Sequence, residues 1–128
     1  MKRAVKQRNG SDCAIAAVAN AVGTSYAAVR RAYPDSVRGG LEDGDIDYLA
    51  GQFGDWRYTN CRKYVELDYW LRRHREGRYV LVISTGFFGV TDHAVAVIDG
   101  RVVGEYTPTW NVSSYWRLLS LKNSPDSR

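Results

Sequence analysis

The sequence predicts an α+β domain in which N-terminal helices pack on a C-terminal antiparallel β-sheet. Alanine-rich and amphipathic stretches that end at glycine or before proline fill the first half of the chain and predict helices. Short β-branched stretches, one followed by an Asp-Gly turn, fill much of the second half and predict antiparallel strands. Helices first and strands second favour an α+β fold. The 128 residues suffice for a single domain, which we place at residues 1–121 with a flexible tail at 122–128.

Two helices are expected near the amino terminus. The first covers residues 14–22, where strong helix formers run up to Gly23, and the second covers residues 26–33 and ends before Pro34. Each follows side chains that can accept hydrogen bonds from the free N–H groups of a helix start: Ser11 or Asp12 for the first, and Thr24 or Ser25 for the second.

A third helix is expected at residues 46–53, after an acidic cluster that includes Asp43, Asp45 and Asp47. Such spacing also occurs in calcium loops, but an EF-hand loop needs a glutamate at its twelfth position, where this sequence has Gly54. We therefore interpret Asp43 or Asp45 as a helix cap. Because the chain also lacks a CxxC or histidine-rich zinc pattern, we expect no metal and no other cofactor.

The second half of the chain begins ambiguously and then becomes clear. Residues 55–65 fit either a short strand or an extended crossing, whereas residues 66–77 predict a helix that ends at Gly77. Strand patterns follow at residues 78–85, 93–98, 101–106 and 113–121. The strands at 93–98 and 101–106 flank Asp99-Gly100 and predict a hairpin.

Charge and hydropathy exclude several classes of protein. The net charge is +4, but the basic residues are scattered and match no nucleic-acid motif, so we do not expect nucleic-acid binding. No apolar run approaches the roughly 20 residues of a membrane span, and we expect no membrane association. The basic start resembles a secretory signal, but polar residues 9–12 and Asn20 interrupt it. With only two cysteines, a reducing cytoplasmic location is expected, and nothing indicates an oligomeric state.

Cys13 and His93 are the candidate catalytic pair. A cysteine attacks carbonyls as the thiolate, which the free N–H groups at a helix start and a nearby imidazole both stabilise. Cys13 occupies such a helix start. His93 opens an apolar strand after a glycine-containing loop, whereas His74 lies among charged residues and is expected at the surface. Gln7 and the Cys13 backbone N–H can together donate hydrogen bonds to the oxyanion that forms.

These residues resemble a known family. The segment from Gln7 through Asp12-Cys13-Ala14 is similar to the active-site segment of papain-like cysteine peptidases, closest to the bacterial branch that trims double-glycine leader peptides. The stretch His93-Ala94-Val95 resembles the histidine strand of the same family. The resemblance implies a papain-like fold, a peptide or protein substrate, Cys13 as nucleophile, His93 as general base and acid, and Gln7 as oxyanion donor.

The third catalytic member departs from the family pattern. Laid over the family's Asn-Ser-Trp, the segment Pro108-Thr109-Trp110 puts proline at the orienting position, where it cannot accept a proton from imidazole. Glu105 is the preferred substitute, because a three-residue turn at Asp99 to Arg101 would set it on the sheet face of His93. A two-residue turn would point it to the other face. The alternatives are Thr107 and Asn111, with Asp92 a poor one because neighbouring strand residues face opposite ways.

A second interpretation stays open. The same scaffold can serve as a binding module with reduced chemistry that regulates or inhibits a protein partner, because fold does not imply function. Cys61 has no glutamine or helix start near it and is expected to be a core or incidental thiol. Three aromatic residues are expected near the histidine end of the sheet, as core or as the wall of a substrate groove: Tyr106, Trp110 and Trp116.

Overall fold

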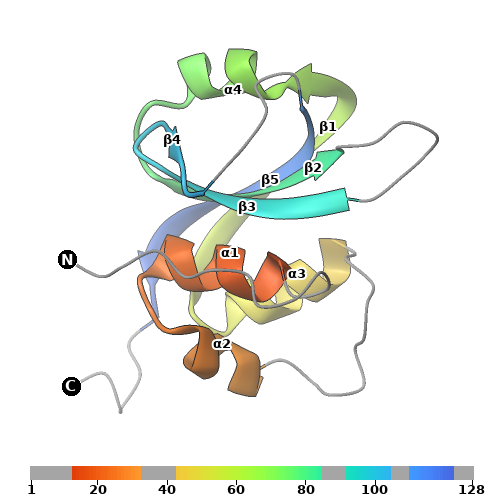
Figure 1. Cartoon of the computed structure of the whole chain (residues 1–128). Coiled ribbons are helices and arrows are strands. Elements are labelled where there is room, and N and C mark those ends of the chain that lie inside the picture. The colour runs from red at the N-terminus through yellow and green to blue at the C-terminus, as the bar shows by residue number, and fades with distance from the viewer. Residues whose placement is uncertain (1–12, 33–42, 85–91, 105–109, 123–128) are drawn as a thin grey trace.

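The computed structural model describes residues 13–32, 43–84, 92–104 and 110–122, without the side chains of 43, 44 and 92. In this part of the chain, four helices and five strands form an α+β fold with a five-stranded antiparallel sheet. Helices α1 and α3 cover one face of the sheet, α2 packs on the side of α1 away from the sheet, and the short helix α4 lies on the opposite face of the sheet (Figure 1). The predicted class and the antiparallel sheet are thus confirmed.

The first two helices form where the sequence predicts them. Helix α1 spans Cys13–Val22 and ends at Gly23, which adopts a left-handed backbone with φ of 78°. Helix α2 spans Tyr26–Ala32, and its cap is Ser25, whose hydroxyl accepts a hydrogen bond from the Ala28 N–H at 3.1 Å. Local capping and stop signals therefore determine both boundaries.

Helix α3 begins earlier than expected. It spans Asp43–Gly51, so Asp45 lies inside the helix and is not its cap. The carboxylate of Asp47 accepts a hydrogen bond from the indole N–H of Trp116 at 3.0 Å and ties the helix to the sheet. No group of three potential metal ligands occurs among the residues that the structure describes.

The sheet has the strand order β1-β5-β2-β3-β4, and all of its pairings are antiparallel. Its strands are β1 Gly54–Glu66, β2 Arg78–Ser84, β3 Asp92–Ile98, β4 Arg101–Val102 and β5 Asn111–Leu121. Residues 55–65, which the sequence left as either a short strand or an extended crossing, are thus part of a long edge strand, β1. Its pairing partner is β5, which begins 45 positions after β1 ends, and this pairing could not be recognised from local patterns.

Helix α4 is shorter than expected, and it changes the interpretation of His74. The helix spans Leu67–Arg73 and ends at His74, three residues before the predicted stop at Gly77. The His74 ring stacks on Trp70 with ring centroids 3.9 Å apart, and its Nδ1 lies 2.7 Å from the Trp70 carbonyl oxygen. His74 is therefore half-buried in a structural contact and is not a free surface residue.

The predicted hairpin is present with a two-residue turn. Ile98 pairs with Arg101, and the turn residues Asp99 and Gly100 have φ values of 49° and 82°. Positive φ at both positions is typical of a type I′ turn, for which Asp-Gly is a favoured pair. Strand β4 then ends at Val102, shorter than the predicted strand at 101–106.

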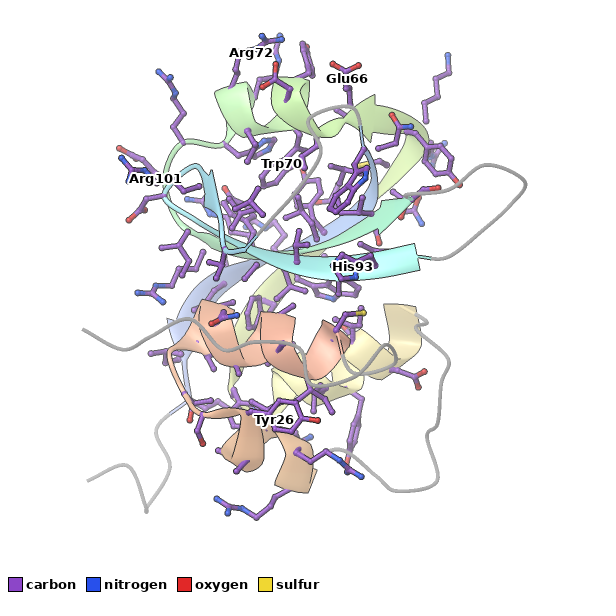
Figure 2. The ribbon with its side chains drawn as sticks, in the orientation of Figure 1. Tyr26, Glu66, Trp70, Arg72, His93 and Arg101 are labelled. Carbon is purple, nitrogen blue, oxygen red and sulfur yellow. The ribbon has the colours of Figure 1, made fainter. Side chains whose placement is uncertain are left out.

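Two apolar clusters lie on the two faces of the sheet. Ala94 and Ala96 of β3 belong to the cluster packed against α1, while Val95 and Val97 belong to the cluster packed against α4. Figure 2 shows Trp70, the largest side chain of the α4 cluster, between that helix and the sheet. Within the described residues, we find no helix with the length and apolar character needed to cross a membrane.

Candidate active site

Cys13 is the first residue of α1 and sits against strand β3. Its side chain is 5% exposed, and its sulfur accepts a hydrogen bond from the backbone N–H of Ala94 at 3.4 Å. Alanines along α1 are buried over β3 and leave room for this close approach. In the described part of the chain α1 begins at Cys13, and the fold brings this residue to Ala94, which directly follows His93.

The sulfur approaches β3 from the side on which β4 begins. The Ala96 carbonyl accepts a hydrogen bond from the Val103 N–H at 2.9 Å, so the main-chain groups of Ala96 point toward β4. Main-chain groups two residues apart on a strand point the same way, so the Ala94 N–H points to that side as well. In the described residues β4 pairs only with Val97 and Ile98 and does not reach Ala94. The Cys13 sulfur accepts the hydrogen bond from the Ala94 N–H instead.

His93 lies at the beginning of β3, which runs above the helix layer in Figure 2. It pairs with Ile83 of β2 and shares a sheet face with Val95, because side chains alternate along a strand. The His93 side chain is half-buried, and this burial lowers the pKa of its imidazole below the usual 6.5. The ring is therefore neutral at pH 7 and able to accept a proton.

Covalent geometry sets an upper limit on the distance between the Cys13 sulfur and the His93 Cα. The Cα of His93 lies about 2.4 Å from the Ala94 nitrogen, as bond lengths and angles require. Since the Cys13 sulfur is 3.4 Å from that nitrogen, it lies within about 6 Å of the His93 Cα. Cys13 belongs to the cluster on the Ala94 face of the sheet, whereas alternation places the His93 side chain on the opposite face with Val95.

Trp110 is the aromatic partner of His93. The two rings meet edge to face, with centroids 5.8 Å apart and an interplanar angle of 74°. The Trp110 carbonyl accepts a hydrogen bond from the Leu67 N–H at 2.6 Å, which anchors the residue at the start of α4. The expected position of Trp110 near the histidine is confirmed. The expected position of Trp116 near the histidine is wrong, because Trp116 pairs with Val80 and packs in the cluster with α1.

The orienting residue of the site is not identified by the described part of the chain. Gln7, Glu105 and Thr107 lie outside the described residues, as do Tyr106 and the side chain of Asp92. The choice of Glu105 as the orienting residue required a three-residue turn at Asp99 to Arg101. The turn has two residues, Asp99 and Gly100, so the strand register that this choice required is absent.

Asn111 is described, and its register argues against an orienting role. It pairs with Ser84 and Glu66, one row away from His93 and two strands across the sheet. Its neighbour Val112 shares the face of His93, so alternation directs Asn111 to the other face.

Cys61 occupies the opposite edge of the sheet, on β1. Neither cysteine is part of a disulfide, and the order of strands separates Cys61 from the β3 side on which Cys13 lies. Burial raises the pKa of the Cys61 thiol, so this thiol is protonated at neutral pH. Cys13, unlike Cys61, lies at a helix start, and its sulfur accepts the Ala94 N–H, which makes Cys13 the candidate nucleophile.

Comparison of the chain with protein-family models, with curated proteins and with solved structures found no match. The resemblance to papain-like peptidases therefore stays a prediction. A function for the site depends on the chain's own residues and their geometry.

Proposed function

We propose that the chain is a cysteine hydrolase of papain-like type, in which Cys13 attacks a peptide or isopeptide carbonyl and His93 acts as general base and acid. The observation that carries this proposal is the hydrogen bond from the Ala94 N–H to the Cys13 sulfur at 3.4 Å. Because Ala94 follows His93 directly, this contact holds the sulfur within about 6 Å of the His93 Cα.

Two electrostatic features support a nucleophilic role for the sulfur. A neutral imidazole is the form that accepts the thiol proton, and burial keeps His93 in that form at pH 7. An N–H group that donates to sulfur favours the thiolate over the thiol, and the Ala94 amide is such a donor. The first-turn N–H groups of the ten-residue helix α1 act in the same direction.

The reaction would proceed in two halves. Cys13 transfers its proton to His93, and the thiolate forms a bond to the carbonyl carbon while the carbonyl oxygen becomes an oxyanion. The Cys13 backbone N–H and the Gln7 amide would stabilise this oxyanion. His93 then protonates the leaving amine as the C–N bond breaks. Finally, water gives a proton to His93 as its oxygen attacks the thioester carbonyl, the C–S bond breaks to release the acid, and His93 returns the proton to the Cys13 sulfur.

A binding module is the second candidate, and one observation favours it. The Cys13 side chain is 5% exposed and belongs to the apolar cluster under β3. A nucleophile must be reached by its substrate, whereas a structural thiol can remain buried. On this alternative the chain regulates or inhibits a protein partner and performs no covalent step.

Alkylation with iodoacetamide at pH 6, followed by mass spectrometry of each cysteine peptide, separates the two candidates. For the hydrolase, Cys13 is alkylated faster than Cys61, and the His93→Ala variant loses the difference. Cys61 is a suitable internal control because burial raises the pKa of its thiol. If Cys13 reacts as slowly as Cys61 in the folded protein, the hydrolase proposal fails and the binding module is favoured.

Turnover is tested with a mixture of short peptides and isopeptides as substrates. We expect hydrolysis by the natural chain and by the Cys61→Ala variant, and none by Cys13→Ala. Equal product from the Cys13→Ala variant would exclude this sulfur as the nucleophile.

A further inference from the structure

A double irregularity in the sheet opens a cavity at the β1 side, where Ser114 lies two strands across from Ala94. On β1, Asn60 pairs with Ser114 and Val65 pairs with Val112, so residues 61–64 bulge out opposite the single residue Ser113. Such a bulge leaves main-chain groups unpaired and redirects side chains.

The neighbouring strand pair is irregular at the same residue. Val82 of β2 pairs with Ser114 and Ile83 pairs with Val112, so Ser113 is also an extra residue relative to β2. The Ser113 hydroxyl donates a hydrogen bond to the Val82 carbonyl at 3.2 Å. This bond gives the carbonyl a partner where the pairing of β2 with β5 is interrupted. The irregularity on the β2 side is therefore stabilised from within the sheet.

The cavity at the bulge has a volume of about 350 Å³. That volume lies at the lower end of the range for small-molecule sites, which is roughly 300–1,000 Å³. None of its described lining residues is acidic, and most of them carry hydrogen-bonding groups: Asn60, Cys61, Arg62, Tyr64, Ser113 and Ser114.

Ser114 is the unusual member of this lining. Its side chain is 1% exposed, and its hydroxyl oxygen has no hydrogen-bond partner among the described residues. A buried hydroxyl without a partner destabilises the folded state, and native proteins contain few such groups. A ligand in the cavity that accepts a hydrogen bond from Ser114 would remove this cost.

Arg62 supplies a positive charge at the same cavity. Its side chain is exposed, and no ion pair to it occurs in the part of the chain that the structure describes. Asn60 uses one amide N–H on the Tyr58 hydroxyl at 3.3 Å and retains a second. Burial raises the pKa of the Cys61 thiol, so this lining residue adds no negative charge at neutral pH.

We infer that this cavity binds a small organic carboxylate, with the Arg62 guanidinium pairing with the carboxylate and the Ser114 hydroxyl donating a hydrogen bond to the ligand. A guanidinium matches the two oxygens of a carboxylate in a fork, and one positive charge balances the single charge of that group. The Tyr64 ring offers an apolar surface to the rest of the ligand. This binding site is independent of the proposed hydrolase activity.

The test uses N-acetylglycylglycine as the probe, in the Cys13→Ala chain so that the candidate active site cannot process it. Binding is followed by amide chemical shifts in NMR. We expect saturable shifts at residues 60–64 and 113–114, and binding about tenfold weaker for the C-terminal amide of the same probe, which removes the charge-assisted pair. Shifts confined to the start of α1 and β3, equal binding of acid and amide, or equally tight binding of inorganic phosphate would overturn the assignment.

Two variants locate the contacts. Arg62→Gln is expected to weaken binding of the probe about tenfold, whereas Arg57→Gln, an exposed arginine on the same strand outside the cavity lining, leaves it unchanged. Ser114→Ala is expected to weaken binding without lowering the melting temperature of the free protein. A fall in melting temperature would mean that the hydroxyl already has a partner, and unchanged binding would exclude it as a contact; either result overturns the assignment.

Discussion

The sulfur of Cys13 accepts a hydrogen bond at 3.4 Å from the amide of Ala94, a residue 81 positions later in the chain. The contact joins the start of α1 to the start of β3 and brings the thiol to the residue that directly follows His93. A core thiol needs no such neighbour, whereas a nucleophile needs both a donor that stabilises the thiolate and a base. This relationship is the structural basis of the proposed hydrolase.

Replacing Trp110 is expected to change the environment of His93. The Trp110 ring lies 5.8 Å from the imidazole, and burial lowers the pKa of His93. Trp110→Ala should expose the ring, raise this pKa toward 6.5 and reduce stability by about 1–3 kcal/mol. NMR titration of the imidazole and urea unfolding measure the two effects. Trp110→Phe retains an aromatic ring and is the control; an unchanged His93 pKa in Trp110→Ala contradicts the prediction.

Protonation of His93 should make the fold less stable in mild acid. Its pKa is lower in the folded protein than the 6.5 of the unfolded chain, so the unfolded chain binds more protons between these two values. Stability should therefore be complete above about pH 6.5 and decrease as the pH falls through the folded pKa. Urea midpoints measured across this range should show the decrease in the natural chain.

The His93→Gln variant provides the control for this pH dependence. It should lose the part of the decrease that His93 causes, whereas His74→Gln, which changes the other histidine, should retain it. Identical pH profiles for the natural chain and His93→Gln would show that burial of His93 is not linked to stability.

The two adjacent serines of β5 should respond differently to the same change. Ser113→Ala removes the hydrogen bond to the Val82 carbonyl and should cost about 0.5–1.5 kcal/mol of unfolding free energy. Ser114→Ala removes a buried hydroxyl that has no partner in the described residues, so stability should stay equal or rise. Denaturant unfolding of both variants gives the comparison. A greater loss of stability from Ser114→Ala than from Ser113→Ala is the contrary result.

Alanine substitutions at two glycines, Gly100 and Gly51, should change the stability of the protein in opposite directions. Gly100 has φ of 82°, and an added Cβ would lie 3.3 Å from the Arg75 backbone, so Gly100→Ala should destabilise the protein by about 1–2 kcal/mol. Gly51, the last residue of α3, has no atom within 4 Å of an added Cβ, and Gly51→Ala should stabilise by about 0.4–1 kcal/mol. Thermal unfolding tests both, and equal melting temperatures for the two variants would contradict this reasoning.

Elements that depend on a few neighbouring residues could be predicted well. Ser25 caps α2, Gly23 ends α1, and Asp99-Gly100 forms the hairpin turn, each as its local chemistry indicates. Strand β1 could not be predicted with the same clarity, because its edge position leaves most of its side chains exposed and blurs the alternation of apolar and polar residues. Its bulge also has no local signal, since it exists only relative to β5.

The candidate site divides in the same way. Cys13 at a helix start and His93 at a strand start could be named from residue type and local pattern. The length of the hairpin turn, on which the choice of Glu105 depended, could not be determined from the sequence, since an Asp-Gly turn admits more than one register. The burial that lowers the pKa of His93 was equally inaccessible, because it comes from packing against other parts of the chain.

The sequence by itself determined the first two helices and the boundary between them, the position of the hairpin, and the residue types able to perform thiol chemistry. These features depend on backbone preferences and contacts within a few positions. Only the tertiary structure decided that Cys13 meets Ala94 beside His93, that Trp116 packs in the cluster with α1, and that β1, β2 and β5 open a cavity at Ser113 and Ser114. Each of these depends on strand register and on packing between distant segments, whose free energy is defined only once the whole core has assembled.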